Sequence, residues 1–157
     1  GARPVGFRCL TIAGTRDPIM IASIDTIIEE VKASVKRNLS LDDDSIRMTF
    51  HLYGKNGVMG CHEPVQQAGH ELGIVLDVVA PTQETANSVC SLVRSTMLHY
   101  GYKNRIATAG NLAFPFSPSD IQSGPVYEFS VYHLIEANDA LRFDYHLEHV
   151  TPQGVQI

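Results

Sequence analysis

The fold of this chain is decided by the stretch Ile46-Arg47-Met48-Thr49-Phe50-His51-Leu52, in which apolar and polar side chains alternate without a break. A two-residue period places every second side chain on the same face, so the stretch predicts a half-buried β-strand. Residues 72–78 show the same alternation, and Pro81 ends it. We interpret these segments as the second and third strands of one sheet.

Two amphipathic helices are predicted on either side of these strands. Between Ser23 and Leu39, apolar residues recur at helical spacing, with acidic residues early and basic residues late. Thr82 can cap a second helix, whose apolar stripe runs over residues 86–100 and is ended by Gly101.

The first and fourth strands are predicted from apolar, β-rich runs at residues 5–15 and 126–135. The resulting order is β-α-β-β-α-β, the split β-α-β layout of a ferredoxin-like α+β fold. In this layout two helices cover one face of an antiparallel sheet and leave the other face for solvent or a partner. We expect one domain over residues 1–157, in which a tail from residue 140 adds a strand or lies across the open face.

Strand direction in this layout brings three connections to one end of the sheet. They are the loops over residues 15–22, 54–69 and 101–125. Two of them exceed the usual connection of roughly four to six residues, and long ordered loops are disproportionately functional. The loop end is therefore the candidate surface for binding, catalysis or assembly.

Composition narrows the function classes. The net charge is −5, from 12 basic and 17 acidic residues, and no block of Lys or Arg exists, which argues against general nucleic-acid or membrane-surface binding. No run of about 18 apolar residues predicts a membrane span. The three cysteines, Cys9, Cys61 and Cys90, are odd in number and lack CxxC spacing, so we expect free thiols and a cytoplasmic protein.

The loop over residues 54–60 has a glycine at every third position and carries Lys55 and Asn56. Its backbone N–H groups either form an anion-binding nest or belong to a hairpin tip with turn glycines. Beyond it, Glu63, His70 and Glu71 are candidates for proton transfer, each also explained as a local hydrogen-bonding residue.

Further candidates lie in the other two loops. Arg16 and Asp17 either pair as a turn lock or leave Arg16 free for an anionic ligand. Asn111 either hydrogen-bonds a ligand carbonyl or has a turn role after Gly110. Ser117 has no nucleophile elbow around it, so it is not a candidate nucleophile. It is a ligand-binding candidate because it lies in the apolar, proline-containing segment of that loop.

Metal binding has weak support. Asp144, His146 and His149 are close in sequence, a pattern more typical of a solvated face than of a ligand cluster. No metal and no cofactor is assigned from the residues.

Together these segments resemble the C-terminal, ferredoxin-fold region of the acyclic terpene utilisation (AtuA-like) family. The segments that carry the resemblance are residues 15–18, 53–60, 63–64, 70–73, 80 with 82–84, 99–100, 108–118 and 128–134. The resemblance implies a domain that follows a much larger N-terminal domain or subunit and works in bacterial catabolism of branched acyclic carboxylic compounds, as CoA thioesters. It implies no settled catalytic residues. The large domain is not part of this sequence, so we expect an excised portion or a stand-alone subunit that does not catalyse alone.

Three hypotheses follow. The first is an accessory domain that docks through its loop end on a larger partner, with Arg16, Lys55 and Asn56 facing an anionic group. The second is a structural homodimerisation module that pairs through the open sheet face or an edge strand. The third, less favoured, is a small metal-dependent enzyme built on the histidines.

Overall fold

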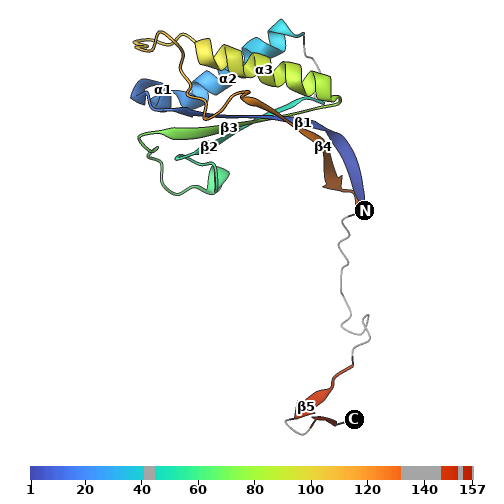
Figure 1. The fold of residues 1–157 in the computed structure, drawn as a ribbon. Coiled ribbons are helices and arrows are strands. Elements are labelled where there is room, and N and C mark those ends of the chain that lie inside the picture. Colours follow the sequence, from blue (N-terminus) through green and yellow to red (C-terminus); the bar gives the residue numbers. More distant parts are fainter. Residues whose placement is uncertain (41–44, 132–145, 152–153, 157) are drawn as a thin grey trace.

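The computed structural model describes residues 1–40, 45–131, 146–151 and 154–156. Four strands form one antiparallel sheet: β1 (Ala2–Thr15), β2 (Arg47–Tyr53), β3 (Leu72–Ala80) and β4 (Asp120–Phe129). Their order is β2-β3-β1-β4, so β3 lies between β1 and β2 (Figure 1). The α+β class and the antiparallel sheet predicted from the sequence are confirmed.

Three helices, not two, lie over one face of this sheet: α1 (Pro18–Ala22), α2 (Ile24–Asn38) and α3 (Gln83–His99) (Figure 1). The predicted cap of α3 is present, because the Thr82 hydroxyl accepts a hydrogen bond from the Thr85 N–H at 3.1 Å. α1 occupies a segment expected to be a loop. Its signal is Asp17 followed by Pro18, a cap and a favoured first helical residue. Five residues are too few for periodicity to reveal a helix.

The core lies between the helices and the inward face of the sheet. The apolar stripes predicted for the two long helices are buried, as are the alternate residues of β3. Fully buried side chains include Cys9, Ile24, Val31, Val35, Val78, Val89, Cys90 and Val93. Burial raises the pKa of the Cys9 thiol and raises that of Cys90 to about 12, so both are packing residues at neutral pH.

β4 corrects the prediction for the fourth strand. It starts at Asp120, six residues before the expected Val126, and residues 132–135 of the prediction lie outside the described part of the chain. The polar run between Ile121 and Pro125 resembles a loop in sequence. It forms a strand because it pairs with β1 at the edge of the sheet, where polar residues and proline are tolerated.

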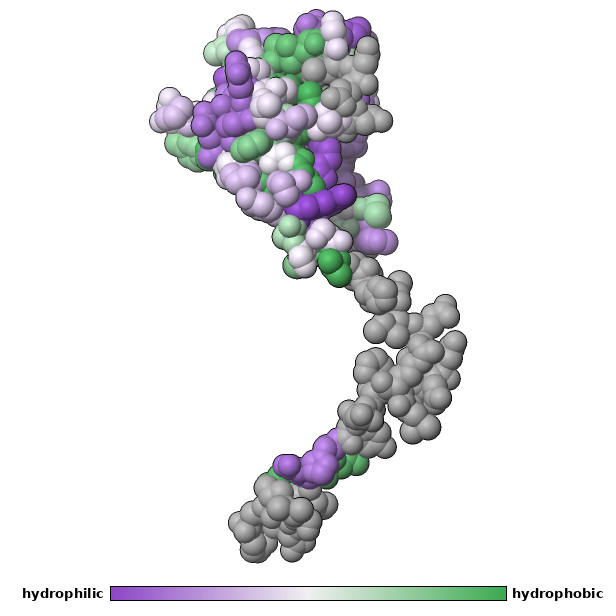
Figure 2. Space-filling model, turned by 90° about the vertical axis from the view of Figure 1, so that its right-hand side faces the viewer, coloured by the Kyte–Doolittle hydropathy of each residue, from purple (hydrophilic) through white to green (hydrophobic). Residues whose placement is uncertain are grey.

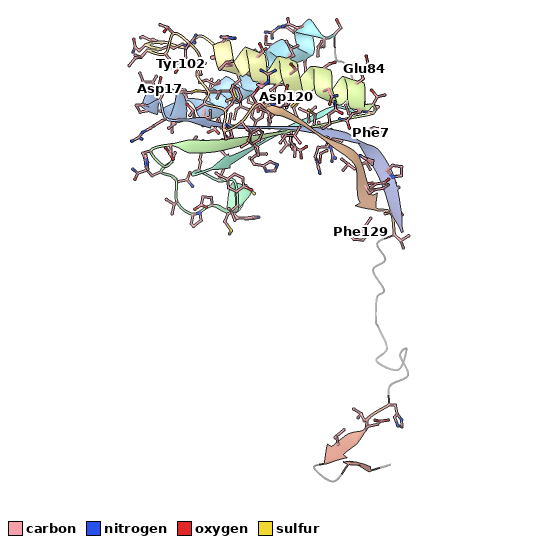
Figure 3. The ribbon with its side chains drawn as sticks, in the orientation of Figure 1. Phe7, Asp17, Glu84, Tyr102, Asp120 and Phe129 are labelled. Carbon is pink, nitrogen blue, oxygen red and sulfur yellow. The ribbon has the colours of Figure 1, made fainter. Side chains whose placement is uncertain are left out.

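Asp120 ties this edge strand to the rest of the domain. Its Oδ1 accepts hydrogen bonds from the Thr11 hydroxyl at 2.6 Å and from Arg94 Nε at 2.8 Å. Figure 3 shows Asp120 at the start of β4, close to α3. One carboxylate therefore joins β1, β4 and α3.

The described part of the tail forms a sheet of its own. β5 (His149–Thr151) pairs with β6 (Gly154–Gln156), and neither strand pairs with the four-stranded sheet. Residues 140–145 of the predicted tail segment lie outside the described residues. Across the described ranges, no helix is long and apolar enough to cross a membrane.

Candidate functional site

Three segments far apart in the sequence meet at one end of the sheet. Residues 14–16, 71–73 and 110–113 line a cavity of about 420 Å³, which we call the loop-end cavity. Gly14 and Ala113 hold its rim together, because each backbone N–H donates to the carbonyl of the other at 2.8 Å. Two of the three connections expected at this end, residues 15–22 and 101–125, contribute to the cavity, and residues 54–69 do not line it.

Arg16 borders the loop-end cavity and also a second cavity of about 510 Å³, which contains His70 and is lined mainly by α1 residues and residues 68–70. Arg16 is exposed, and within the described residues its guanidinium has no hydrogen bond and no ion pair. The proposed turn lock with Asp17 is therefore wrong in this structure. Within the described residues, the positive charge of Arg16 is therefore unpaired.

Asp17 is engaged elsewhere. Its Oδ1 accepts from the Ile19 N–H at 2.8 Å, and its Oδ2 accepts from the Tyr102 hydroxyl at 2.6 Å. The Tyr102 hydroxyl bond lowers the pKa of Asp17, and burial together with that carboxylate raises the pKa of Tyr102 to about 12. Figure 3 shows both residues at the end of the domain that carries α1. Sequence reasoning missed Tyr102, because nothing local links residues 85 apart.

Asn111 neither faces a ligand carbonyl nor makes a local turn bond after Gly110, because its donors are used at the end of α3. Its amide nitrogen donates to the carbonyls of Met97 at 3.0 Å and Tyr100 at 2.8 Å, and its backbone N–H donates to Leu98 at 2.8 Å. Both amide hydrogens are therefore used at the end of α3 and cannot orient a ligand carbonyl. Its Oδ1 is buried and has no hydrogen-bond partner in the described part of the protein.

The glycine loop does not form an anion nest. The N–H groups of Lys55, Asn56 and Gly57 all donate to the carbonyl of Leu52, at 3.1, 3.1 and 2.9 Å, so they close the end of β2. Gly57 is required here, since a Cβ would lie 2.8 Å from the Tyr53 nitrogen. The hairpin-tip interpretation describes this loop.

The loop residues of the first hypothesis do not gather around one ligand. The Lys55 ammonium forms an ion pair with Asp25 of α2. Lys55, Asn56 and Glu63 line a separate cavity of about 230 Å³, to which Arg16 does not contribute. Glu63 also accepts the Val65 N–H at 3.0 Å, as a local turn residue does.

Of the remaining candidates, two lie near Arg16 and one does not. His70 borders the second cavity of Arg16, and Glu71 borders the loop-end cavity, so these two lie close to Arg16. Ser117 is exposed and borders neither cavity. The structure thus brings Arg16, His70, Glu71 and Asn111 to one region.

Metal ligands do not gather in the described ranges, where no group of three or more His, Cys, Asp or Glu side chains is placed to hold an ion. Asp144 lies outside those ranges. His146 Nε2 lies 3.9 Å from a Glu148 oxygen, and both side chains are exposed.

Searches of protein-family models, of curated proteins and of solved structures found no match to this chain. Its function has to be argued from the region around Arg16.

Proposed function

We propose that this chain is a carboxylate-binding accessory domain that docks through its loop end on a larger partner domain or subunit. Arg16 would supply the cationic contact in a pocket for a carboxylate or an acyl-CoA thioester. The acyclic terpene utilisation type of catabolism is the context that the resemblance implies. The observation that carries the proposal is an exposed guanidinium, unpaired within the described residues, on the border of two cavities.

A free guanidinium is suited to this task. It presents several N–H donors in a planar fork that matches a carboxylate, and such charge-assisted hydrogen bonds are stronger than neutral ones. The second cavity adds apolar walls from Pro18, Ile21, Ala22 and Ala68. Apolar walls with one placed charge favour a branched aliphatic chain that ends in an acid group.

We also place the fold in the ferredoxin-like class. The support is that β3 lies between β1 and β2, that β4 lies beside β1, and that the helices cover one face. Among the described residues, β2 and β4 are the edge strands, and no α-helix covers the second face of the sheet.

Replacing Arg16 should weaken carboxylate binding without unfolding the domain. We expect Arg16→Gln to weaken binding of 4-methylpentanoate at least tenfold, because a charge-assisted hydrogen bond contributes roughly 1.5–3 kcal/mol. Titration calorimetry of both proteins measures this. Arg47→Gln is the matched control, because Arg47 is also exposed but starts β2, away from the loop end.

The docking part of the proposal needs a cellular measurement. In the organism that encodes the chain, Arg16→Glu should slow growth on branched acyclic carboxylates and leave growth on succinate unchanged. Wild-type affinity of Arg16→Gln for 4-methylpentanoate would refute ligand binding by Arg16. Unchanged growth of the Arg16→Glu strain would refute the accessory role.

A homodimerisation module is the second candidate, favoured by the arm that β1 and β4 form beyond the end of β3 (Figure 1). Register places Ala2 opposite Phe129, Pro4 opposite Tyr127, and Phe7 opposite Pro125. These pairs share one apolar face, on which Tyr127 is 60% and Phe129 88% exposed. Figure 2 views this side, and hydrophobic residues reach the surface at the lower end of the folded domain. Exposed aromatic patches mark protein–protein contacts.

Dimerisation through this arm predicts a concentration-dependent mass in sedimentation experiments. The double change Tyr127→Lys and Phe129→Lys should leave a monomer at every concentration, because charged ammonium groups cannot be buried unpaired at the contact. Tyr53→Lys is the control, since Tyr53 is 50% exposed on the other edge strand. A wild-type chain that stays monomeric throughout excludes this candidate.

A further inference from the structure

The loop-end cavity holds two uncompensated charges of opposite sign. Thr15 and Leu72 are the last registered pair of β1 and β3, so Arg16 and Glu71 stand one step beyond the end of this ladder. Both are exposed and both border the cavity. They form no ion pair with each other, and neither pairs with another described residue. A complementary ligand would carry both charges.

Two glycines lie beside these charges. Gly14 and Gly73 are registered partners on β1 and β3, and both line the cavity. Neither has the positive φ that requires glycine. A Cβ at Gly73 would meet the Tyr53 Cβ at 3.6 Å, and one at Gly14 would meet the Leu72 oxygen at 3.7 Å, which are ordinary contacts. Packing and backbone conformation therefore do not demand glycine at these positions, and the missing side chains leave open space next to Arg16 and Glu71.

A buried polar residue also lines this cavity. Asn111 is 7% exposed and lines it, and its Oδ1 has no hydrogen-bond partner among the described residues. The Asn111 amide nitrogen donates to the Met97 and Tyr100 carbonyls, which fixes this wall of the cavity to the end of α3. Leu112 and Ala113 supply apolar contacts beside it.

We infer that the loop-end cavity binds a small zwitterion, an α-amino acid with an aliphatic side chain. Arg16 receives the carboxylate, and Glu71 receives the ammonium. The aliphatic side chain packs against Leu112 and Ala113. The inference rests on the proposed function, because it takes Arg16 as the carboxylate contact and narrows the ligand class of the same cavity. A volume of about 420 Å³ lies within the usual range for small-molecule sites, roughly 300–1,000 Å³.

Matched probes test both charges separately. Calorimetry compares leucine with 4-methylpentanoate, which lacks the ammonium, and with 3-methylbutylamine, which lacks the carboxylate; isoleucine and valine are treated likewise. We expect at least one amino acid to bind the wild-type chain tenfold or more tightly than either of its counterparts. Glu71→Gln should lower amino-acid affinity to that of the deaminated acid and leave the affinity for that acid unchanged. Arg16→Gln should lower both.

Two further variants separate ligand binding from folding. Gly73→Val should abolish binding of every probe while the unfolding temperature does not fall, because valine favours a strand and its Cβ has room. Glu84→Gln should change nothing, since Glu84 is exposed at the start of α3, away from the end that carries α1 (Figure 3).

The outcomes distinguish the two proposals. If 4-methylpentanoate binds in an Arg16-dependent way but no amino acid binds better, the zwitterion inference fails and the carboxylate-binding function stands. The inference also fails if Glu71→Gln leaves the amino acid binding as much more tightly than its deaminated acid as it does in the wild type. That result would show that Glu71 does not contact the ammonium. If none of the probes binds, both proposals fail.

Discussion

Asp120→Ala should lower the free energy of unfolding by about 3 kcal/mol, because the change removes two short hydrogen bonds and leaves a cation without its partner. The Asp120 and Arg94 side chains are each only 24% exposed, so water compensates the lost contacts poorly. Thr11 is 3% exposed, and its hydroxyl would lose its carboxylate acceptor. The start of β4 would then detach from β1 and α3.

Glu128→Ala is the matched control for this prediction, measured alongside by urea unfolding. Glu128 is also a β4 carboxylate paired with an arginine, Arg3, but these side chains are 43% and 68% exposed. Exposed ion pairs contribute roughly 0–1 kcal/mol, so Glu128→Ala should be nearly neutral. Equal effects of the two changes would show that the burial of Asp120 and Arg94 does not strengthen their interaction.

Asn111→Ala should destabilise the domain by about 2 kcal/mol, because the Met97 and Tyr100 carbonyls at the end of α3 lose their donor. The backbone bond from the Asn111 N–H to Leu98 is retained, which limits the loss. Asn111→Ala also removes the buried Oδ1 that has no hydrogen-bond partner in the described part of the chain, which offsets part of the lost stability. Asn111→Asp should cost more than Asn111→Ala, because a carboxylate would face the carbonyls of Met97 and Tyr100 with no hydrogen to donate.

Chemical unfolding with intrinsic tyrosine fluorescence ranks these variants against Thr108→Ala. Thr108 is exposed in the same loop, so its removal should be neutral. The order wild type, Asn111→Ala, Asn111→Asp from most to least stable is the expected result. If Asn111→Asp is as stable as the wild type, the amide hydrogens do not hold the end of α3, and Asn111 becomes available to a ligand through its nitrogen.

The secondary structure could be predicted where a periodic apolar pattern is long enough to repeat. Residues 46–52 and 72–78 show a strand period, and the stripe from Ile24 to Val35 a helical one, and each is buried or half-buried on the expected side. The pattern failed for α1, which is a single short turn, and for β4, whose pairing with β1 overrides a polar sequence. Local signals are weak where one long-range pairing supplies the stabilisation.

The candidate site could be predicted only in part, since residue type indicates what a side chain can do but not what it touches. Arg16 and Lys55 are both loop cations, yet Lys55 is paired with Asp25 and Arg16 is unpaired within the described residues. Asp17 is a loop carboxylate with the chemistry of a ligand contact, but the hydroxyl of Tyr102, 85 residues away, occupies it.

By itself, the sequence determined the α+β class, the two long helices, the two alternating strands and the placement of the long loops, because these follow from local periodicity and chain direction. Only the tertiary structure decided which polar groups are already used and which are left for a ligand. It closed the glycine loop onto Leu52, assigned Asn111 to the end of α3, and brought Arg16 and Glu71 to one cavity. The physical reason is that hydrogen bonds and ion pairs depend on distances between residues far apart in the chain, which no local pattern encodes.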